Sequence, residues 1–127
     1  MTVTAGSSIT AGIGSASTTV SKSIASVPAG ATIVLGIQNR SNETAVISGI
    51  SDDVNGAWTL NYVDGPDDIV NGTMRCWMAY RNNCSAGTTN VTVTFGGAIN
   101  SQLAANYIVS DQGALTFDAA ATTLDTN

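Results

Sequence analysis

Residues 72–95, GTMRCWMAYRNNCSAGTTNVTVTF, decide the fold class of this chain. Apolar and polar side chains alternate with period two on both sides of a turn of small residues at 85–87, and this pattern predicts two β-strands. In the second strand, the side chains predicted to face inward are those of Val91, Val93 and Phe95. In the first strand, they are those of Met74, Cys76, Met78 and Tyr80.

This parity places Trp77 on the outward face, flanked by Arg75 and Arg81. An outward tryptophan between arginines is typical of a contact surface, because aromatic and arginine side chains supply much of the binding energy of interfaces. We therefore predict that Trp77, Arg75 and Arg81 are interface residues. The alternative is that Trp77 is a core residue and that a β-bulge shifts the register of its strand.

Short strands separated by turn residues are predicted along the rest of the chain. Trp58 is predicted to face the core together with Leu60 and Tyr62. No segment shows a helical period, and roughly eight short strands at regular spacing indicate a single antiparallel β-sandwich over residues 18–127. Further strands are predicted at residues 19–27, 32–38, 44–51, 57–63, 103–110 and 115–119.

Residues 1–17 consist almost entirely of Gly, Ser, Thr and Ala, which predicts an extended N-terminal arm instead of a core element. Ile9 and Ile13 are its isolated large apolar residues, and we expect them to fill shallow pockets on a neighbouring subunit or on another partner protein. The alternative is a floppy terminus without a partner.

The composition is poor in charge. Only 10% of the 127 residues are charged, against roughly 25% in typical soluble domains, which favours a surface covered by neighbours. The net charge of −5 makes a nucleic-acid partner unfavourable, because no basic stripe can neutralise phosphates. We also expect no membrane partner, since no apolar run reaches ~18 residues. The N-terminus lacks the pattern of a secretory signal, so we expect synthesis in the cytoplasm.

One residue type that many catalytic sites need is missing. The chain has no histidine, which excludes Ser-His-Asp and Cys-His catalysis and most zinc sites. We predict a non-enzymatic protein without cofactor or metal. Cys76 and Cys84 are predicted to be buried free thiols, and a disulfide between them is the alternative.

The aspartates of two loops could instead supply oxygen ligands for calcium. These loops flank one predicted strand and therefore lie at its opposite ends, so they would form two sites or none. We favour solvated turn acids, because Asp is common in turns for backbone reasons alone. The residues concerned are Asp52, Asp53, Asp64, Asp67 and Asp68.

Four stretches carry a resemblance to a known family: VPAGATIVLGI at 27–37, NGAWTL at 55–60, WMAYRNNCSAGTTNVTVTF at 77–95 and ALTFDAAATT at 114–123. Their order resembles the jelly-roll-like β-sandwich domains of bacteriophage virion proteins, including head decoration (cement) proteins. The resemblance covers about residues 27–123, while the N-terminal arm lies outside it. Longer members of the family continue past the Asp-Ala segment, whereas this chain ends at Asn127.

The resemblance implies a jelly-roll sandwich and a structural protein that decorates and stabilises a phage capsid. The implied partners are the major capsid protein and further copies of the chain, commonly as a homotrimer. The pockets for Ile9 and Ile13 would then lie on the capsid shell or on a neighbouring subunit. The implied location is the capsid surface of the virion. Two alternatives remain open: a carbohydrate-binding or adhesin module with Trp77 as a stacking platform, and a tail or fibre component of the same virion.

Overall fold

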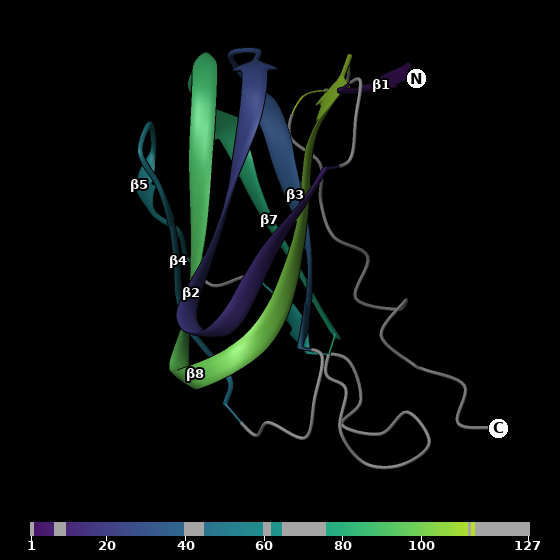
Figure 1. Ribbon diagram of the computed structural model, residues 1–127. Helices are drawn as coiled ribbons and strands as arrows, with labels where there is room; N and C mark the ends of the chain where they lie inside the picture. Colours follow the sequence, from purple (N-terminus) through teal and green to yellow (C-terminus); the bar gives the residue numbers. More distant parts are fainter. Residues whose placement is uncertain are drawn as a thin grey trace, which may run out of the picture.

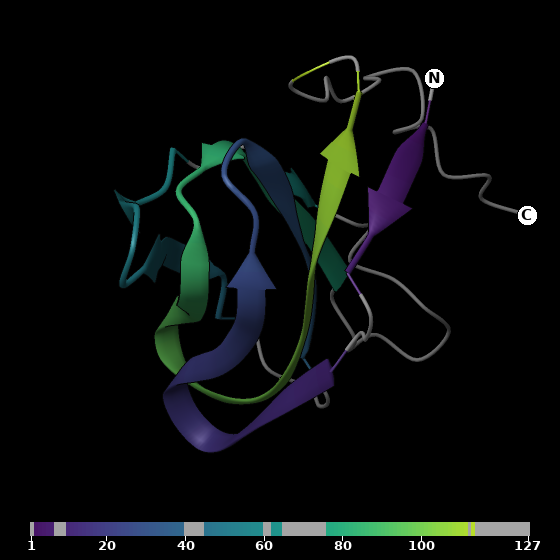
Figure 2. The same cartoon turned by 90° about the horizontal axis from the view of Figure 1, so that it is seen from above.

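The computed structural model shows an antiparallel β-sheet that curls into a half-barrel (Figures 1 and 2). It describes residues 2–6, 10–39, 45–59, 62–64, 76–111 and 113. The predicted all-β fold is confirmed, since these residues form strands and turns and include no helix. Accordingly, the described part of the chain contains no helix able to cross a membrane.

Eight strands form one sheet, in the order β5-β4-β8-β3-β7-β6. β1 and β2 pair with the opposite edge of β8, and every pairing is antiparallel. The strands are β1 (Val3–Ala5), β2 (Thr10–Val27), β3 (Ala31–Asn39), β4 (Ile47–Asp52), β5 (Gly56–Ala57), β6 (Tyr62–Asp64), β7 (Cys76–Cys84) and β8 (Gly87–Ser110).

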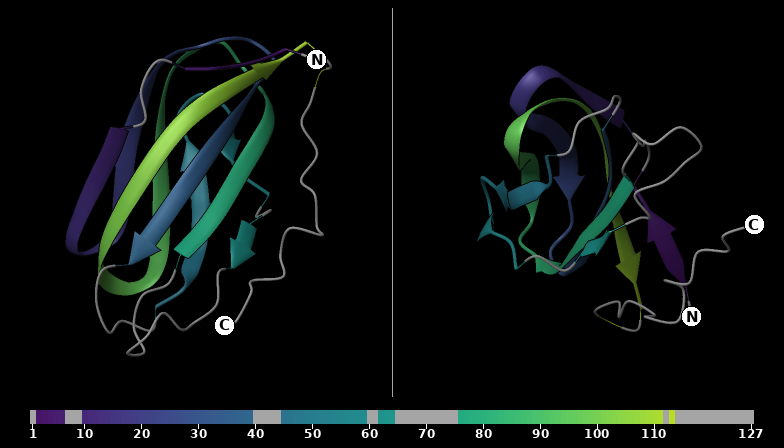
Figure 3. Two further views of the ribbon diagram at one scale, coloured as in Figure 1. Left: turned by 90° about the vertical axis from the view of Figure 1, so that its right-hand side faces the viewer. Right: turned by 90° about the horizontal axis from the view of Figure 1, so that it is seen from below.

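The 24-residue strand β8 produces the curl. Its first half pairs with β4 as far as Phe95. Its second half pairs with β3 from Ser101 onward. Gly96 and Gly97 lie between the two halves, where glycine permits a strand to bend sharply. The sequence predicts separate strands here. The structure instead has one bent strand, because β2 pairs with β8 on both sides of the bend (Figure 3).

β2 bends together with β8, and its two limbs touch. An added Cβ on Gly12 would lie 2.5 Å from the carbonyl oxygen of Ser21, and one on Gly14 would lie 3.1 Å from that of Thr19. Only glycine fits so close an approach of two backbones. At the bend, the Ala16 N–H donates to Asn100 Oδ1 at 3.1 Å.

Part of the predicted N-terminal arm therefore belongs to the sheet. Val3–Ala5 pairs with Ile108–Ser110, and residues 10–14 pair with 101–105. The predicted boundary at residue 17 falls inside β2. The described residues of this segment are ordered by β8 of their own chain, whereas the arm was expected to need a neighbouring subunit.

The core lies on the concave side of the curled sheet. Val91, Val93 and Phe95 are buried there, as predicted, and so is Trp58. The other large contributors come from β2, β3, β4, β7 and the second half of β8. They are Val20, Ile24, Val27, Ile33, Leu35, Ile37, Ile47, Ile50, Trp77, Ile99 and Leu103.

The predicted outward orientation of Trp77 is wrong. Trp77 is 3% exposed, and its ring centroid lies 6.2 Å from that of Phe95. Trp77 pairs with Ile37, which pairs in turn with Leu103. Directly opposed residues share a face of the sheet, so the inward face of β3 places Trp77 inward. Met78 accordingly points outward and is 47% exposed.

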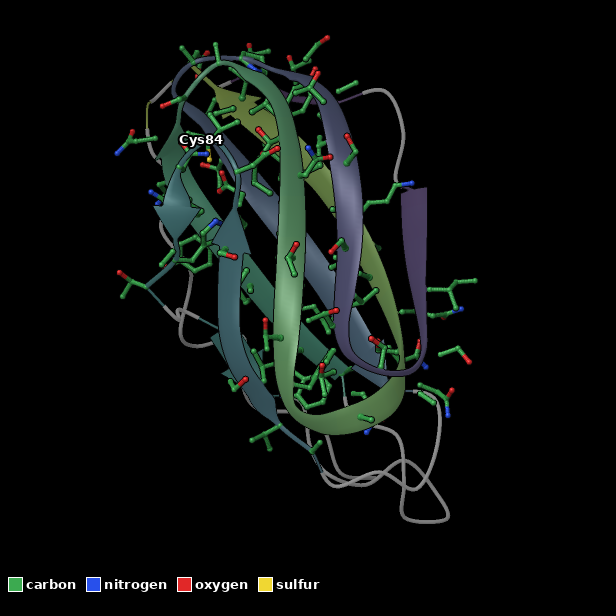
Figure 4. All side chains as sticks on the ribbon, turned by 60° about the vertical axis from the view of Figure 1, so that its left-hand side comes forward. Cys84 is labelled. Carbon is green, nitrogen blue, oxygen red and sulfur yellow. The ribbon has the colours of Figure 1, made fainter. Side chains whose placement is uncertain are left out.

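Both cysteines are free, and their burial differs. Cys84 is buried as predicted (Figure 4), and burial raises the pKa of its thiol. Cys76 is exposed, so its predicted burial is wrong for the same reason as the parity of Trp77. A register shift between Ala31 and Ile33, opposite Arg81–Cys84, returns Cys84 to the inward face.

Two further predicted strands differ from the structure or lie outside it. The predicted strand at 57–63 is replaced by the short strands β5 and β6, and Trp58 and Thr59 belong to neither. The predicted strand at 115–119 lies outside the described residues.

Candidate interaction surfaces

The turn after β4 is organised by the buried carboxylate of Asp52. Its Oδ1 accepts hydrogen bonds from the N–H groups of Val54 and Asn55 and from the Asn55 side chain. Its Oδ2 accepts from Trp58 Nε1 at 2.6 Å. Both carboxylate oxygens are thus used by donors of the same chain, which makes Asp52 a structural residue.

Arg81 connects this turn to β7. Its Nη1 donates to the carbonyl oxygen of Ala57 at 3.0 Å, and its Nη2 donates to that of Asn55 at 3.1 Å. Asn55 Oδ1 also accepts a 2.8 Å hydrogen bond from the N–H of Ser85. Arg81, which the sequence predicts to be an interface residue, thus links β7 to the turn after β4, near the opposite edge of the sheet.

A polar pocket of about 300 Å³ lies beside this link. Its lining combines two aromatic residues with arginine, asparagine and threonine, which suits a small polar ligand. The lining residues are Ala57, Trp58, Thr59, Tyr80, Arg81 and Asn82.

The loop aspartates have differing surroundings. Exposed Asp53 accepts hydrogen bonds from the backbone N–H and the side chain of Asn90, and these lower the pKa of its carboxyl. Asp67 and Asp68 lie outside the described residues. Within the described part, no group of three acidic or cysteine side chains comes together to hold a metal ion.

The convex side of β2, β8, β3 and β7 forms a broad face, which we call the β3–β7 face (Figure 3, left). A groove of about 290 Å³ crosses it, lined by Gly36, Ile37, Gln38, Cys76, Trp77, Gln102 and Ala104. None of the residues that we assign to the β3–β7 face carries a charge. They are Ile13, Val34, Gly36, Gln38, Cys76, Met78, Tyr80, Gln102, Ala104 and Asn106.

The convex side of β2, the first half of β8 and β4 forms a second face, which we call the hydroxyl face. Ser21 and Thr92 hydrogen-bond through their hydroxyl oxygens at 2.8 Å, and Ser48 Oγ donates to the Thr94 carbonyl oxygen at 3.2 Å. The strand residues of this face are also uncharged, and the exposed carboxylate of Asp53 lies beside it, bonded to Asn90. These strand residues are Thr19, Ser21, Ser23, Gly49, Ser51, Asn90, Thr92 and Thr94.

The three predicted interface residues that the structure describes do not gather on one surface. Trp77 lies in the core, and Arg81 bonds to the turn after β4. Ile13 is 66% exposed on the β3–β7 face, opposite Gln102. Ile9 and Arg75 lie outside the described residues.

Sequence reasoning missed the groove. The error in the parity of β7 placed Met78 and Cys76 in the core and Trp77 outside. The one sequence signal for the correct parity is the alternating Ile33, Leu35 and Ile37 of the strand that β7 joins.

Comparisons with protein-family models, with curated proteins and with solved structures found no match.

Proposed function

We propose that this chain is a non-enzymatic structural protein of a bacteriophage virion that decorates and stabilises the capsid. The observation that supports it best is the pair of broad outer faces, formed by uncharged strand residues, on one curled antiparallel sheet. Weakly charged faces of this breadth suit contact with neighbouring protein better than with bulk water. The four stretches that resemble virion decoration proteins point the same way.

We further propose a jelly-roll fold and an oligomeric assembly for this protein. The curled sheet is the main part of a jelly-roll β-sandwich, and the protein acts as a homo-oligomer, a trimer by the resemblance, bound to the major capsid protein. Its place is the outer capsid surface, and its work is buried interface area without a catalytic step.

The test uses capsids of the virus whose genome encodes the chain. The purified full-length protein is mixed with capsids that lack it, and binding is measured by co-sedimentation and located by cryo-electron microscopy. We expect saturable binding at regular positions on the shell and greater resistance of the capsid to heat. Virions that lack the protein by mass spectrometry would contradict the proposal. Density on the tail alone would favour the tail or fibre component.

The polar pocket supports a second candidate, a carbohydrate-binding or adhesin module. Tyr80, Arg81 and Asn82 line it together with Trp58, and a sugar needs such a combination of aromatic and polar residues. Trp77 cannot serve as the stacking platform, because it is buried. Binding to a glycan panel that is lost in Tyr80→Ala would favour this candidate. An empty panel would count against it.

A further inference from the structure

We propose that the β3–β7 face packs against a second copy of this chain. This inference deepens the proposed function and rests on it for the expectation that several copies meet. The apolar side chain of β7 that protrudes on this face is that of Met78, since Trp77 is buried.

The β3–β7 face is uneven, because it places large side chains beside small ones. Met78 lies opposite Gly36, and Gly36 lies opposite Ala104, so a large apolar side chain stands beside two of the smallest residues. The groove of about 290 Å³ follows these small residues. Ile13 protrudes on the far side, in the row of Gln102. A protrusion and a hollow on one surface allow two copies to interlock.

Met78 and Ile13 are costly to leave in water. They are 47% and 66% exposed, and they lie on one face within four adjacent strands. Single exposed apolar residues need no explanation, but here each one lies opposite a residue that lines the groove, Gly36 or Gln102. Apolar side chains beside a groove mark a contact surface. The residues named for the hydroxyl face include no large apolar side chain, and the hydroxyl groups of Ser21 and Thr92 hydrogen-bond to each other there.

The charge distribution favours a second copy as the occupant. The chain has a net charge of −5, so two copies repel unless their contact excludes acidic groups. The charged side chains that the structure describes lie away from the β3–β7 face, and an acidic or basic partner would find no complementary charge there. Those side chains are Lys22, Asp52, Asp53, Arg81 and Asp111.

The size of the face predicts the strength of the contact. Four strands at ~4.8 Å spacing and five residues at ~3.4 Å give a footprint of roughly 300–400 Å². Stable interfaces bury about 800 Å² per partner, so we expect a weak, concentration-dependent association. Neighbouring positions on a larger assembly would strengthen it by raising the effective concentration.

The test uses the full chain and variants that place a charge on the face. Met78→Glu and Ala104→Glu each bury an unpaired acid if the contact forms. Thr19→Glu is the matched control, because it adds the same charge at an exposed strand position of the hydroxyl face. Far-UV circular dichroism confirms that each variant is folded, and sedimentation equilibrium up to millimolar concentration measures association.

Cys76 provides an independent readout. It lines the groove, whereas Cys84 is buried, so a thiol reagent reports on Cys76 in the folded protein. We expect association of the wild-type chain, at least tenfold weakening in Met78→Glu and in Ala104→Glu, and little change in Thr19→Glu. The reaction of Cys76 should slow as protein concentration rises in wild type and in Thr19→Glu, but not in Met78→Glu.

A wild-type chain that stays monomeric throughout this range would overturn the inference. So would an association that both face variants leave unchanged, or one that Thr19→Glu weakens equally. Capsids decorated by a strictly monomeric chain would overturn it and leave the proposed function standing. Self-association through this face without any binding to capsids would support it and contradict the proposed function.

Discussion

Trp58 Nε1 donates a 2.6 Å hydrogen bond to Oδ2 of Asp52, and both residues are buried. The remaining bonds to Asp52 come from the turn between them. One carboxylate therefore orients the turn after β4 and the indole that follows it.

Asp52→Asn should destabilise the fold by about 2–4 kcal/mol. Hydrogen bonds to a buried carboxylate are strong, and the amide NH₂ group of the new asparagine would face N–H groups that need an acceptor. Urea unfolding followed by tryptophan fluorescence measures the loss. Asp53→Asn is the control, since Asp53 is exposed, and its effect should be clearly smaller. Equal effects of the two variants would contradict a structural role for Asp52.

Trp77→Ala should lower the stability of the isolated chain by about 3–5 kcal/mol, because it leaves a cavity against Phe95 in the core. Thermal melting measures the effect. Met78→Ala, at the neighbouring outward position, should change the melting temperature little. A stable Trp77→Ala chain would show that the tryptophan is not part of the core.

Arg81→Met should loosen the link between β7 and the turn after β4. Two hydrogen bonds to the carbonyl groups of Asn55 and Ala57 are lost, at a cost of about 1–2 kcal/mol for a partly exposed side chain. Hydrogen exchange should accelerate at residues 55–58 and stay slow in the ladder between β3 and β8. Uniform acceleration across the sheet would mean that Arg81 acts on global stability instead.

Gly12→Ala should cost about 1–3 kcal/mol, because the new Cβ would lie 2.5 Å from the carbonyl oxygen of Ser21 in the other limb of β2. Gly49→Ala is the matched control, since its Cβ would meet nothing within 4 Å. Removing a glycine there should be neutral or slightly stabilising. Chemical denaturation of both variants measures the difference, and a harmless Gly12→Ala would show that the limbs of β2 do not touch.

Alkaline pH should destabilise the protein through Cys84. Burial raises the pKa of this thiol in the folded chain above the ordinary value of 9.0. The unfolded chain then loses its proton first, so stability is full below pH 9.0 and falls as pH rises from there through the folded pKa. Unfolding free energies measured from pH 7 to 10.5 in reducing buffer should fall less steeply in Cys84→Ala than in wild type.

The sequence alone was enough for those features that depend on local pattern. The alternation of Val91, Val93 and Phe95 with threonines identifies a strand and its buried face, because the outward set contains no large apolar residue. The turn at Asp52–Gly56 and the burial of Trp58 follow from turn chemistry and local spacing in the same way.

Tertiary structure decided the parity of β7, the course of β8 and the position of the first residues. Both faces of β7 carry apolar side chains, so alternation shows that two faces exist but not which of them is buried. Pairing of Trp77 with Ile37 settles that choice, and continuous pairing with β2 carries β8 through Gly96 and Gly97. These pairings join residues far apart in the sequence, and the buried surface that they create lies in no single segment.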